Sequence, residues 1–189
     1  MDSPRSRPPF RLLLVLAAVA ATVLGLVAPA TAAEPFCGIT WGSLEKTGAA
    51  TGPAGVITNV RAGQHDCYDR LVIDMAGTSG AAYDVRYVPR VIADPSGLPV
   101  ALRGGAFLQI TVREPIYDVN GNPTFTPADP QELVDTAGFA TFRQAALTGS
   151  FEGVTNLGLG VRARLPFRVF TLAGPGNGGR VVIDVAHHW

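Results

Sequence analysis

Lysine is almost absent from this sequence of 189 residues, in which Lys46 is the only lysine among fifteen basic side chains. Charge of either sign is also scarce, because charged residues make up 16% of the chain and balance to a formal net charge of zero. Without an excess of positive charge, the chain lacks the basic surface that general binding to nucleic acid or to anionic membranes requires. The preference for arginine, with abundant alanine and glycine, is typical of a G+C-rich bacterial genome.

Long apolar runs are absent except for Leu12–Val27, whose sixteen residues fall short of the roughly 20 that a membrane-spanning helix needs. Three arginines precede this run and a stretch of small residues, 28–33, follows it, which is the order of a secretory signal peptide. We predict that residues 1–33 are removed on secretion by cleavage after Ala33. Cleavage at Ala32 or Ala30 and a retained membrane anchor are the alternatives. Residues 34–189 then form one secreted domain of net charge −2 with no membrane span.

Cysteine occurs only twice, as Cys37 and Cys67. In an exported chain the two thiols are expected to form a disulfide, which closes a loop of about 30 residues and stabilises the fold by roughly 3 to 4 kcal/mol. His65 and Asp69 lie close to Cys67 in the sequence. A catalytic thiol must be free, however, so a structural role is favoured over a nucleophile or a metal site. We expect no metal and no cofactor.

The usual hydrolase motifs are missing as well. Ser150 lies in a glycine-flanked segment, but a nucleophile elbow needs glycine two residues before the serine, where this chain has Thr148. His187 and His188 are adjacent, so on a strand they point to opposite faces and cannot by themselves hold one metal ion. The sequence favours a protein that is not an enzyme.

Convincing helical periodicity is scarce, whereas short alternating runs bounded by Gly, Pro, Asn and Asp recur along the chain. This pattern predicts an all-β fold, a single-domain β-sandwich of about ten short strands, with a barrel as the alternative. The spaces between the runs are too short for the crossover helices of an α/β fold. The predicted strands are 38–41, 56–61, 68–75, 83–88, 100–103, 107–113, 142–147, 155–162, 167–172 and 180–186.

One short helical connector is predicted over residues 130–137. Asp129 is a suitable N-cap, and Pro130 suits the first helical position. Glu132 completes a capping box, and Gly138 can end the segment.

The segment Glu114–Asp129 is rich in Pro, Asn and Asp and predicts a long protruding hairpin or loop, with the Asn-Gly pair at Asn120 as its tight turn. Long loops in compact domains are often functional, so Tyr117, Asp118 and Asn120 are candidate binding residues. A loop without function is the alternative. The acidic and amide residues imitate a calcium loop, but Pro123 occupies the position of the required glycine.

Arg162, Arg164 and Arg168 form the densest basic cluster and are the other candidate binding residues. On an extended segment Arg162 and Arg164 share a face, from which they can donate charge-assisted hydrogen bonds to an anionic glycan or polymer. The alternative is a solvated strand edge, whose charges discourage aggregation.

A short internal repeat, which we call the echo, is the most informative feature of the sequence. Asp69–Met75 and Gly179–Val185 both contain Arg, three aliphatic residues and Asp at the same relative positions. Alternation directs the aliphatic set of each run into the core and the Arg and Asp to the other face. If the two strands are antiparallel neighbours, Arg70 faces Asp184 and Asp74 faces Arg180, which predicts two cross-strand ion pairs.

These runs, in this order, resemble AMIN-like domains, a group related to the AMIN domains of secreted envelope proteins. The resemblance covers nearly all of residues 34–189 and extends to YDVRYV at 83–88, GGAFLQI at 104–110, FEG at 151–153 and LGVRARLPFRV at 159–169. It implies a β-sandwich without catalysis that localises proteins at the cell envelope through peptidoglycan or envelope partners. No amidase or secretin domain follows here, so we expect a ligand-binding or adaptor protein that acts alone.

The sequence therefore predicts a secreted, noncatalytic cell-envelope module that contacts peptidoglycan or an associated glycan. A protein-protein adaptor, which pairs a partner strand with a sheet edge, is the alternative. An unrecognised hydrolase is a third reading and requires a convergent set of catalytic groups in a pocket.

Overall fold

The structure, a computed structural model, describes residues 35–189. The predicted signal peptide lies outside the described residues. No helix within 35–189 is both long and apolar enough to cross a membrane. After a short 3-10 turn, η1 (Phe36–Gly38), the described chain forms eleven strands: β1 (Lys46–Gly48), β2 (Val56–Gln64), β3 (Tyr68–Ala76), β4 (Tyr83–Val88), β5 (Val91–Ile92), β6 (Pro99–Val100), β7 (Ala106–Val112), β8 (Phe142–Phe151), β9 (Val154–Val161), β10 (Phe167–Ala173) and β11 (Gly179–Ala186).

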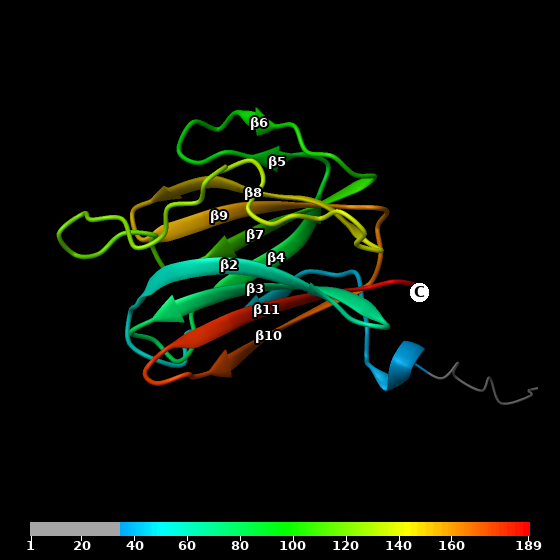
Figure 1. The fold of residues 1–189 in the computed structure, drawn as a ribbon, viewed down its shortest axis with the longest axis horizontal. Helices are drawn as coiled ribbons and strands as arrows, with labels where there is room; N and C mark the ends of the chain where they lie inside the picture. The colour runs from blue at the N-terminus through cyan, green and yellow to red at the C-terminus, as the bar shows by residue number, and fades with distance from the viewer. Residues whose placement is uncertain (1–34) are drawn as a thin grey trace, which may run out of the picture. The chain divides into compact units, whose positions relative to one another are not determined.

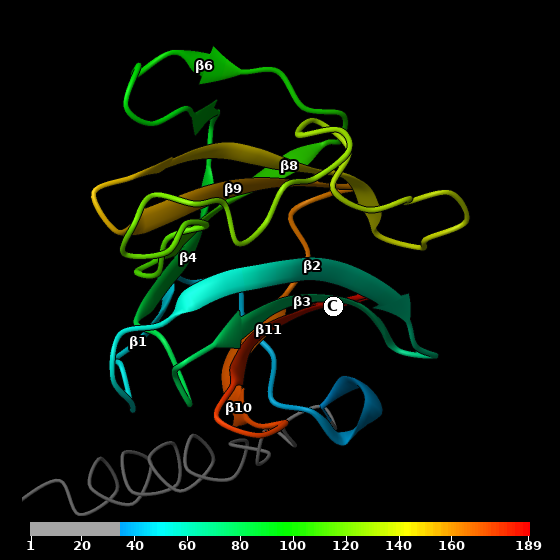
Figure 2. The same ribbon diagram turned by 60° about the vertical axis from the view of Figure 1, so that its left-hand side comes forward.

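The strands form two antiparallel sheets that face each other, as the all-β prediction requires (Figures 1 and 2). One sheet has the order β1-β4-β7-β9-β8 and the other the order β10-β11-β3-β2, while β5 and β6 make a separate short hairpin. The core lies between the sheets, because the inward residues of both are fully buried: Leu71, Ile73 and Ile183 from one sheet, and Leu108, Ile110 and Leu159 from the other. The predicted β-sandwich is confirmed.

Most predicted strands are present, with ends shifted by a few residues. Two predicted strands are wrong: 38–41, and 100–103, of which only Val100 belongs to a strand, β6. Residues 38–41 are not a strand, because the chain turns through η1 and only Gly42 makes a bridge, to Phe167 of β10. The short strands β1 and β5 had no alternating pattern long enough to be recognised.

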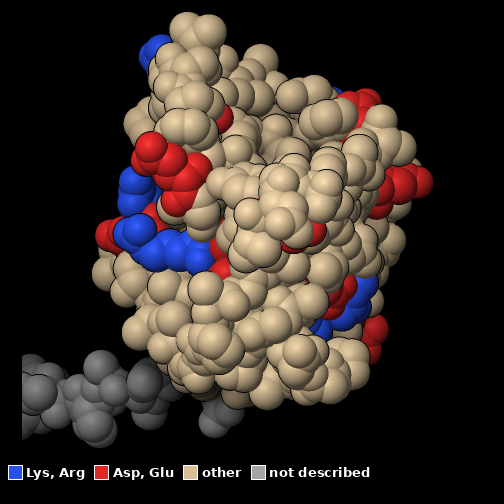
Figure 3. All heavy atoms as spheres, turned by 90° about the vertical axis from the view of Figure 1, so that its left-hand side faces the viewer, with Lys and Arg blue, Asp and Glu red and all other residues tan. Residues whose placement is uncertain are grey.

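The predicted hairpin within Glu114–Asp129 forms and projects at one end of the sandwich, where it is the yellow-green loop farthest to the left in Figure 1. Tyr117 and Pro123 are bridged across it, and Gly121 donates its N–H to the carbonyl of Asp118 at 2.9 Å. Figure 3 looks onto this end of the molecule, where acidic and basic atoms gather toward the sides and uncharged atoms fill the centre.

The helical connector predicted over 130–137 is wrong: the segment makes a turn at Pro130 and then follows an irregular path of bends beside β8. The N-cap does form, because Asp129 accepts the N–H of Gln131 at 2.8 Å. The helix does not follow, since Leu133 donates its N–H to Ala145 of β8 at 2.8 Å instead of to its own turn. The segment thereby covers the free edge of the five-stranded sheet, which would otherwise invite pairing with other chains.

The predicted neighbourhood of the two echo strands is confirmed, since β3 and β11 pair antiparallel with Arg70 opposite Asp184 and Arg180 opposite Asp74. The first pair forms an ion pair at 2.7 Å. The second does not, because the carboxylate of Asp74 turns to Arg61 of β2 at 2.8 Å. The repeated Arg and Asp therefore predict the β3–β11 register correctly, but competition from Arg61 of β2 decides which arginine binds Asp74.

A disulfide and a buried carboxylate fasten the N-terminal segment and the C-terminus. Cys37 and Cys67 are bonded, as predicted. Asp69 is fully buried; burial opposes its ionisation, but donated hydrogen bonds from the hydroxyl and N–H of Thr141 outweigh this and lower the pKa of Asp69. The ring of His187 lies 3.2 Å from the same carboxylate. Asp69 and His187 thus serve the fold.

The β5–β6 hairpin and the segment after it cover the outer face of the five-stranded sheet, and glycine makes this close approach possible. A Cβ added at Gly160 of β9 would collide with the carbonyl of Arg103 and touch Leu102. We expect Gly160→Ala to lower the free energy of unfolding by roughly 1–3 kcal/mol, because a rigid backbone must move. Urea denaturation measures this.

Gly63→Ala is the matched control, because Gly63 also lies in a strand but has open space around the position of an added Cβ. Its expected change is within about 0.5 kcal/mol. Equal losses in the two variants would contradict the packing of this segment on the sheet.

Candidate functional site

The outer face of the four-stranded sheet carries aromatic rings interleaved with arginines. Alternation directs one side chain in two away from the core, and the register aligns those side chains in rows across the strands. One row contains Arg168, Asp184 and Arg70, and the next contains Phe170 beside Val182. We call this surface the arginine–aromatic face, and define it by Trp41, Tyr68, Arg70, Arg168, Phe170 and Asp184.

Asp184 is the centre of the face. Its side chain has no exposed surface, and its two oxygens accept hydrogen bonds from two arginines. Arg70 donates from Nε at 2.7 Å and from Nη2 at 2.9 Å, and Arg168 donates from Nε at 2.8 Å. The bond from Asp184 raises the pKa of Arg70 further. One buried negative charge therefore holds two positive charges at fixed positions, which leaves the cluster with an excess of one positive charge.

The aromatic rings of the face lie against the two guanidinium groups. The guanidinium of Arg168 lies 5.5 Å from the ring centre of Trp41, 5.3 Å from that of Tyr68 and 5.1 Å from that of Phe170. Arg70 lies 5.1 Å from the Tyr68 ring and 5.5 Å from the Phe170 ring. These are cation–π distances, so the rings and the arginines hold one another in place.

Both arginines keep hydrogen-bonding capacity for a ligand. Each guanidinium carries five N–H groups. Arg70 uses Nε and Nη2, for Asp184 and the hydroxyl of Tyr68, and Arg168 uses Nε and Nη2 for Asp184. Their side chains are 23% and 31% exposed. Within 35–189 the Nη1 groups of both have no partner, so they are available to an anionic or polar group placed on the face.

A second row extends the positive charge along the sheet. Arg61 binds Asp74 through Nε at 2.8 Å and Nη2 at 3.0 Å. Arg180 donates to the carbonyl of Ala173 at 3.2 Å and pairs with no carboxylate among the described residues. Together with the arginine–aromatic face, this row gives the outer surface of the four-stranded sheet four arginines and two aspartates.

The structure separates the three arginines of the predicted basic cluster. Arg168 belongs to the arginine–aromatic face. Arg162 and Arg164 lie in the connection between β9 and β10, not on a strand. Arg162 donates to the carbonyl of His187 at 2.7 Å, and Arg164 donates to that of Ser43 at 3.1 Å. Ser43 follows Trp41 closely, so Arg164 lies beside the segment that carries this ring.

The other predicted binding residues lie on the projecting hairpin. The carboxylate of Asp118 accepts hydrogen bonds from the side-chain amide of Asn122 at 3.0 Å and from the backbone N–H groups of Asn122 and Asn120 at 2.8 and 2.9 Å, and these bonds lower the pKa of Asp118. Tyr117 accepts the N–H of Gly153 through its hydroxyl at 3.0 Å. Asp118 and Tyr117 thus shape the hairpin and its base.

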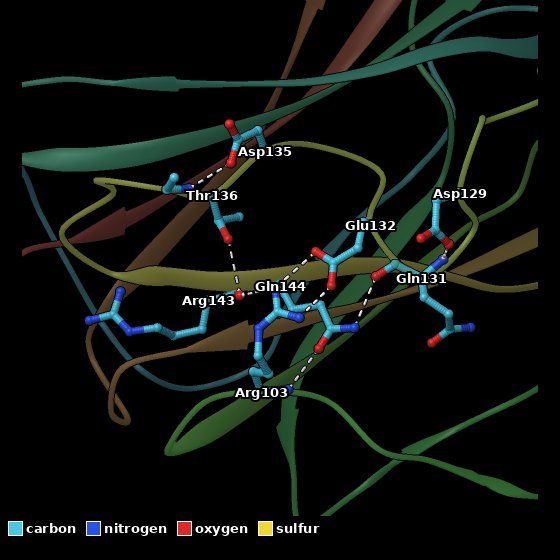
Figure 4. Close-up of polar contacts among 9 residues, drawn as sticks. Arg103, Asp129, Gln131, Glu132, Asp135, Thr136, Arg143 and Gln144 are labelled. Carbon is cyan, nitrogen blue, oxygen red and sulfur yellow. Dashed lines mark hydrogen bonds and ion pairs between the residues drawn. The ribbon is translucent and has the colours of Figure 1, made fainter.

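Two polar hollows on the other sheet are less suited to a ligand, because their polar groups bind one another. The first, of about 450 Å³, lies over β8, and Figure 4 shows its network. Arg103 and Glu132 point toward each other as an ion pair, and Gln144 bonds the N–H of Arg103 at 2.8 Å. The second, of about 430 Å³, holds Asn156, which is bonded to Thr111 and Asp94.

Sequence reasoning missed most of the arginine–aromatic face. Arg168 and Phe170 are two residues apart, so alternation alone could have placed them on one face with the echo arginines. Tyr68 precedes Arg70 by two residues and carries the same signal. Trp41 gave no such signal in the sequence, because it lies outside the strands and only the folding of the chain brings it to the arginine–aromatic face.

Comparison with known proteins gives a match to a protein family. The family model of the AMIN-like domain matches residues 55–187, which is well over half of the chain. No curated protein matches, and no solved structure matches. The match agrees with the resemblance in the sequence and associates the chain with the cell envelope.

Proposed function

Since the chain belongs to the AMIN-like domain family, we propose that it is a noncatalytic, secreted envelope module that binds peptidoglycan through the arginine–aromatic face. The observation that carries this proposal is the row in which Asp184 holds two arginines between aromatic rings, with an Nη1 group of each left open. A preorganised and partly exposed set of this kind has little to lose in entropy when a ligand binds.

The chemistry of peptidoglycan suits such a face. Its sugar rings have apolar surfaces that stack on aromatic side chains, as Trp41 and Phe170 provide. Its peptides carry carboxylates, which guanidinium groups bind with directed, charge-assisted hydrogen bonds. The outer surface of a sheet is broad and shallow, which fits a polymer better than a small molecule that needs a deep pocket.

Two groups that could serve as nucleophiles are engaged in other ways, which supports a noncatalytic role. Both cysteines are consumed by the disulfide. The hydroxyl of Ser150 lies 2.9 Å from that of Thr155, and among the described residues no histidine bonds to it. Without an adjacent base a serine hydroxyl is a weak nucleophile.

Sedimentation with insoluble peptidoglycan tests the proposal. The purified protein is mixed with walls from which attached polymers have been removed, at low and at moderate salt. We expect retention at both, and Trp41→Ala is expected to weaken it about tenfold, which corresponds to about 1.4 kcal/mol. Trp189→Ala is the matched control, because Trp189 is 71% exposed and outside the face.

Other outcomes of the same experiment would redirect the proposal. Retention only on walls that keep their anionic polymers, with loss at moderate salt, would assign binding to the arginines as charges, including Arg162 and Arg164. No retention under any condition would overturn wall binding. It would favour a protein partner that pairs with β2, the terminal strand of its sheet.

A further inference from the structure

An apolar groove of about 590 Å³ lies beside the base of the projecting hairpin. The hairpin itself is seen at the left of Figure 1, and Figure 3 looks onto this end of the molecule. It is formed where β2 begins, where β3 and β7 end, and where the hairpin passes over them. Its walls include Val56, Ala76, Pro115, Tyr117 and Val119, the last of which is fully exposed at the hairpin. This volume is typical of sites that hold a small organic group.

Glu114 is the unusual residue of the groove. Its side chain is buried, with 3% of the residue exposed, and it lines an otherwise mostly apolar surface. One carboxylate oxygen accepts the N–H of Gly55 at 2.6 Å. Within 35–189 no cation lies within ion-pair distance, and the second oxygen has no hydrogen-bond donor. A buried carboxylate normally has a paired charge or several donors.

Glu114 in its ionised form costs stability. Burial raises the pKa of Glu114 above its ordinary value, and the single N–H of Gly55 offsets this only in part. A raised folded-state pKa means that stability is complete below the unfolded pKa and is lost as the pH rises through the folded value. Among residues 35–189 the fold thus gives this carboxylate one donor and no paired charge, a pattern expected at a functional site.

The other charged residues of the groove do not neutralise Glu114. Arg113 also lines the groove, but among residues 35–189 its guanidinium forms no ion pair with Glu114 and does not contribute to the pKa shift of that carboxyl. The carboxylate of Asp118 is bonded to N–H groups of the hairpin. With two acidic groups and one basic group, the lining has an excess of one negative charge.

We propose that this groove binds a primary ammonium group carried on an aliphatic chain, with the ammonium paired to Glu114 and the chain against the apolar walls. The open oxygen of Glu114 supplies the acceptor that a three-donor ammonium needs. Val56, Pro115 and Tyr117 supply the apolar contact. This site is separate from the arginine–aromatic face, so it stands or falls independently of wall binding.

A titration with n-butylammonium chloride tests the site. The purified protein is followed at pH 7 by the amide resonances of Gly55, Gly77 and Gly153, which surround the groove. We expect saturable shifts with a dissociation constant on the order of 1 mM, because the probe has few atoms. The neutral isostere 1-butanol is expected to bind at least tenfold more weakly, since it lacks the charge that Glu114 pairs with.

Glu114→Gln is the decisive variant, because glutamine still accepts the N–H of Gly55 and only the charge is lost. We expect it to fold and to bind butylammonium at least tenfold more weakly. Glu152→Gln is the matched control, since Glu152 is exposed and adjacent to Gly153. Equal affinity for butylammonium and 1-butanol, or unchanged affinity in Glu114→Gln, would overturn the assignment; neither result depends on peptidoglycan.

Discussion

Replacing Asp184 by asparagine is expected to lower the free energy of unfolding by about 3 kcal/mol, because two arginines then face each other without their buried counter-charge. Asp184 has no exposed side-chain surface and binds both Arg70 and Arg168. The loss falls at the lower end of the range for broken buried pairs, since the two arginines are partly exposed and water relieves some of their repulsion. Urea denaturation at neutral pH measures it.

The echo in the sequence provides the control for this prediction. Asp74 occupies the same place in its strand as Asp184 does in the other, but its partner Arg61 has a side chain 51% exposed. Asp74→Asn is therefore expected to cost less than about 1 kcal/mol. If the two substitutions cost the same, the distinction between a buried centre and a solvated pair on this face is wrong.

Loss of the disulfide is expected to have the other large effect. The bond between Cys37 and Cys67 closes a loop with a sequence separation of 30, so the double variant Cys37→Ser, Cys67→Ser is expected to be less stable by roughly 3 to 4 kcal/mol. The two midpoints in urea, for the oxidised protein and the double variant, test this.

The same bond also supports the candidate site. Trp41 donates its ring N–H to the carbonyl of Phe36 at 2.8 Å, so the ring is held by the segment that Cys37 anchors to β3. We expect the folded double variant to bind peptidoglycan more weakly than the oxidised protein. Full binding after removal of the disulfide would show that Trp41 does not need this anchor.

Alternation and the echo were enough to predict the sandwich, the β3–β11 register and the Arg70–Asp184 pair. These features follow from short-range periodicity, which one sequence displays directly. The exchange of Asp74 from Arg180 to Arg61 could not be predicted, because it depends on the position of β2 across the sheet. The pairing of two strands can be predicted from the sequence, whereas the competition of a third strand for the same side chain can be seen only in the fold.

The wrong helix over 130–137 has a similar cause. Its local capping signal is real, since Asp129 accepts the N–H of Gln131. The N–H of Leu133, however, bonds to the carbonyl of Ala145 at the edge of β8 instead of to a carbonyl in its own helical turn. Glu114 is a comparable case. In the sequence it is one acidic residue at the start of a loop, and only the structure shows that it is buried with no ion-pair partner among residues 35–189.

Trp41 fluorescence during a titration with soluble peptidoglycan fragments tests the central claim most directly. The chain has two tryptophans, so Trp189→Phe leaves Trp41 as the only reporter on the arginine–aromatic face. We predict a saturable change in its emission that Phe170→Ala weakens. Binding to the fragments by calorimetry with no change in Trp41 emission would contradict the account, because the ligand would then lie elsewhere on the molecule.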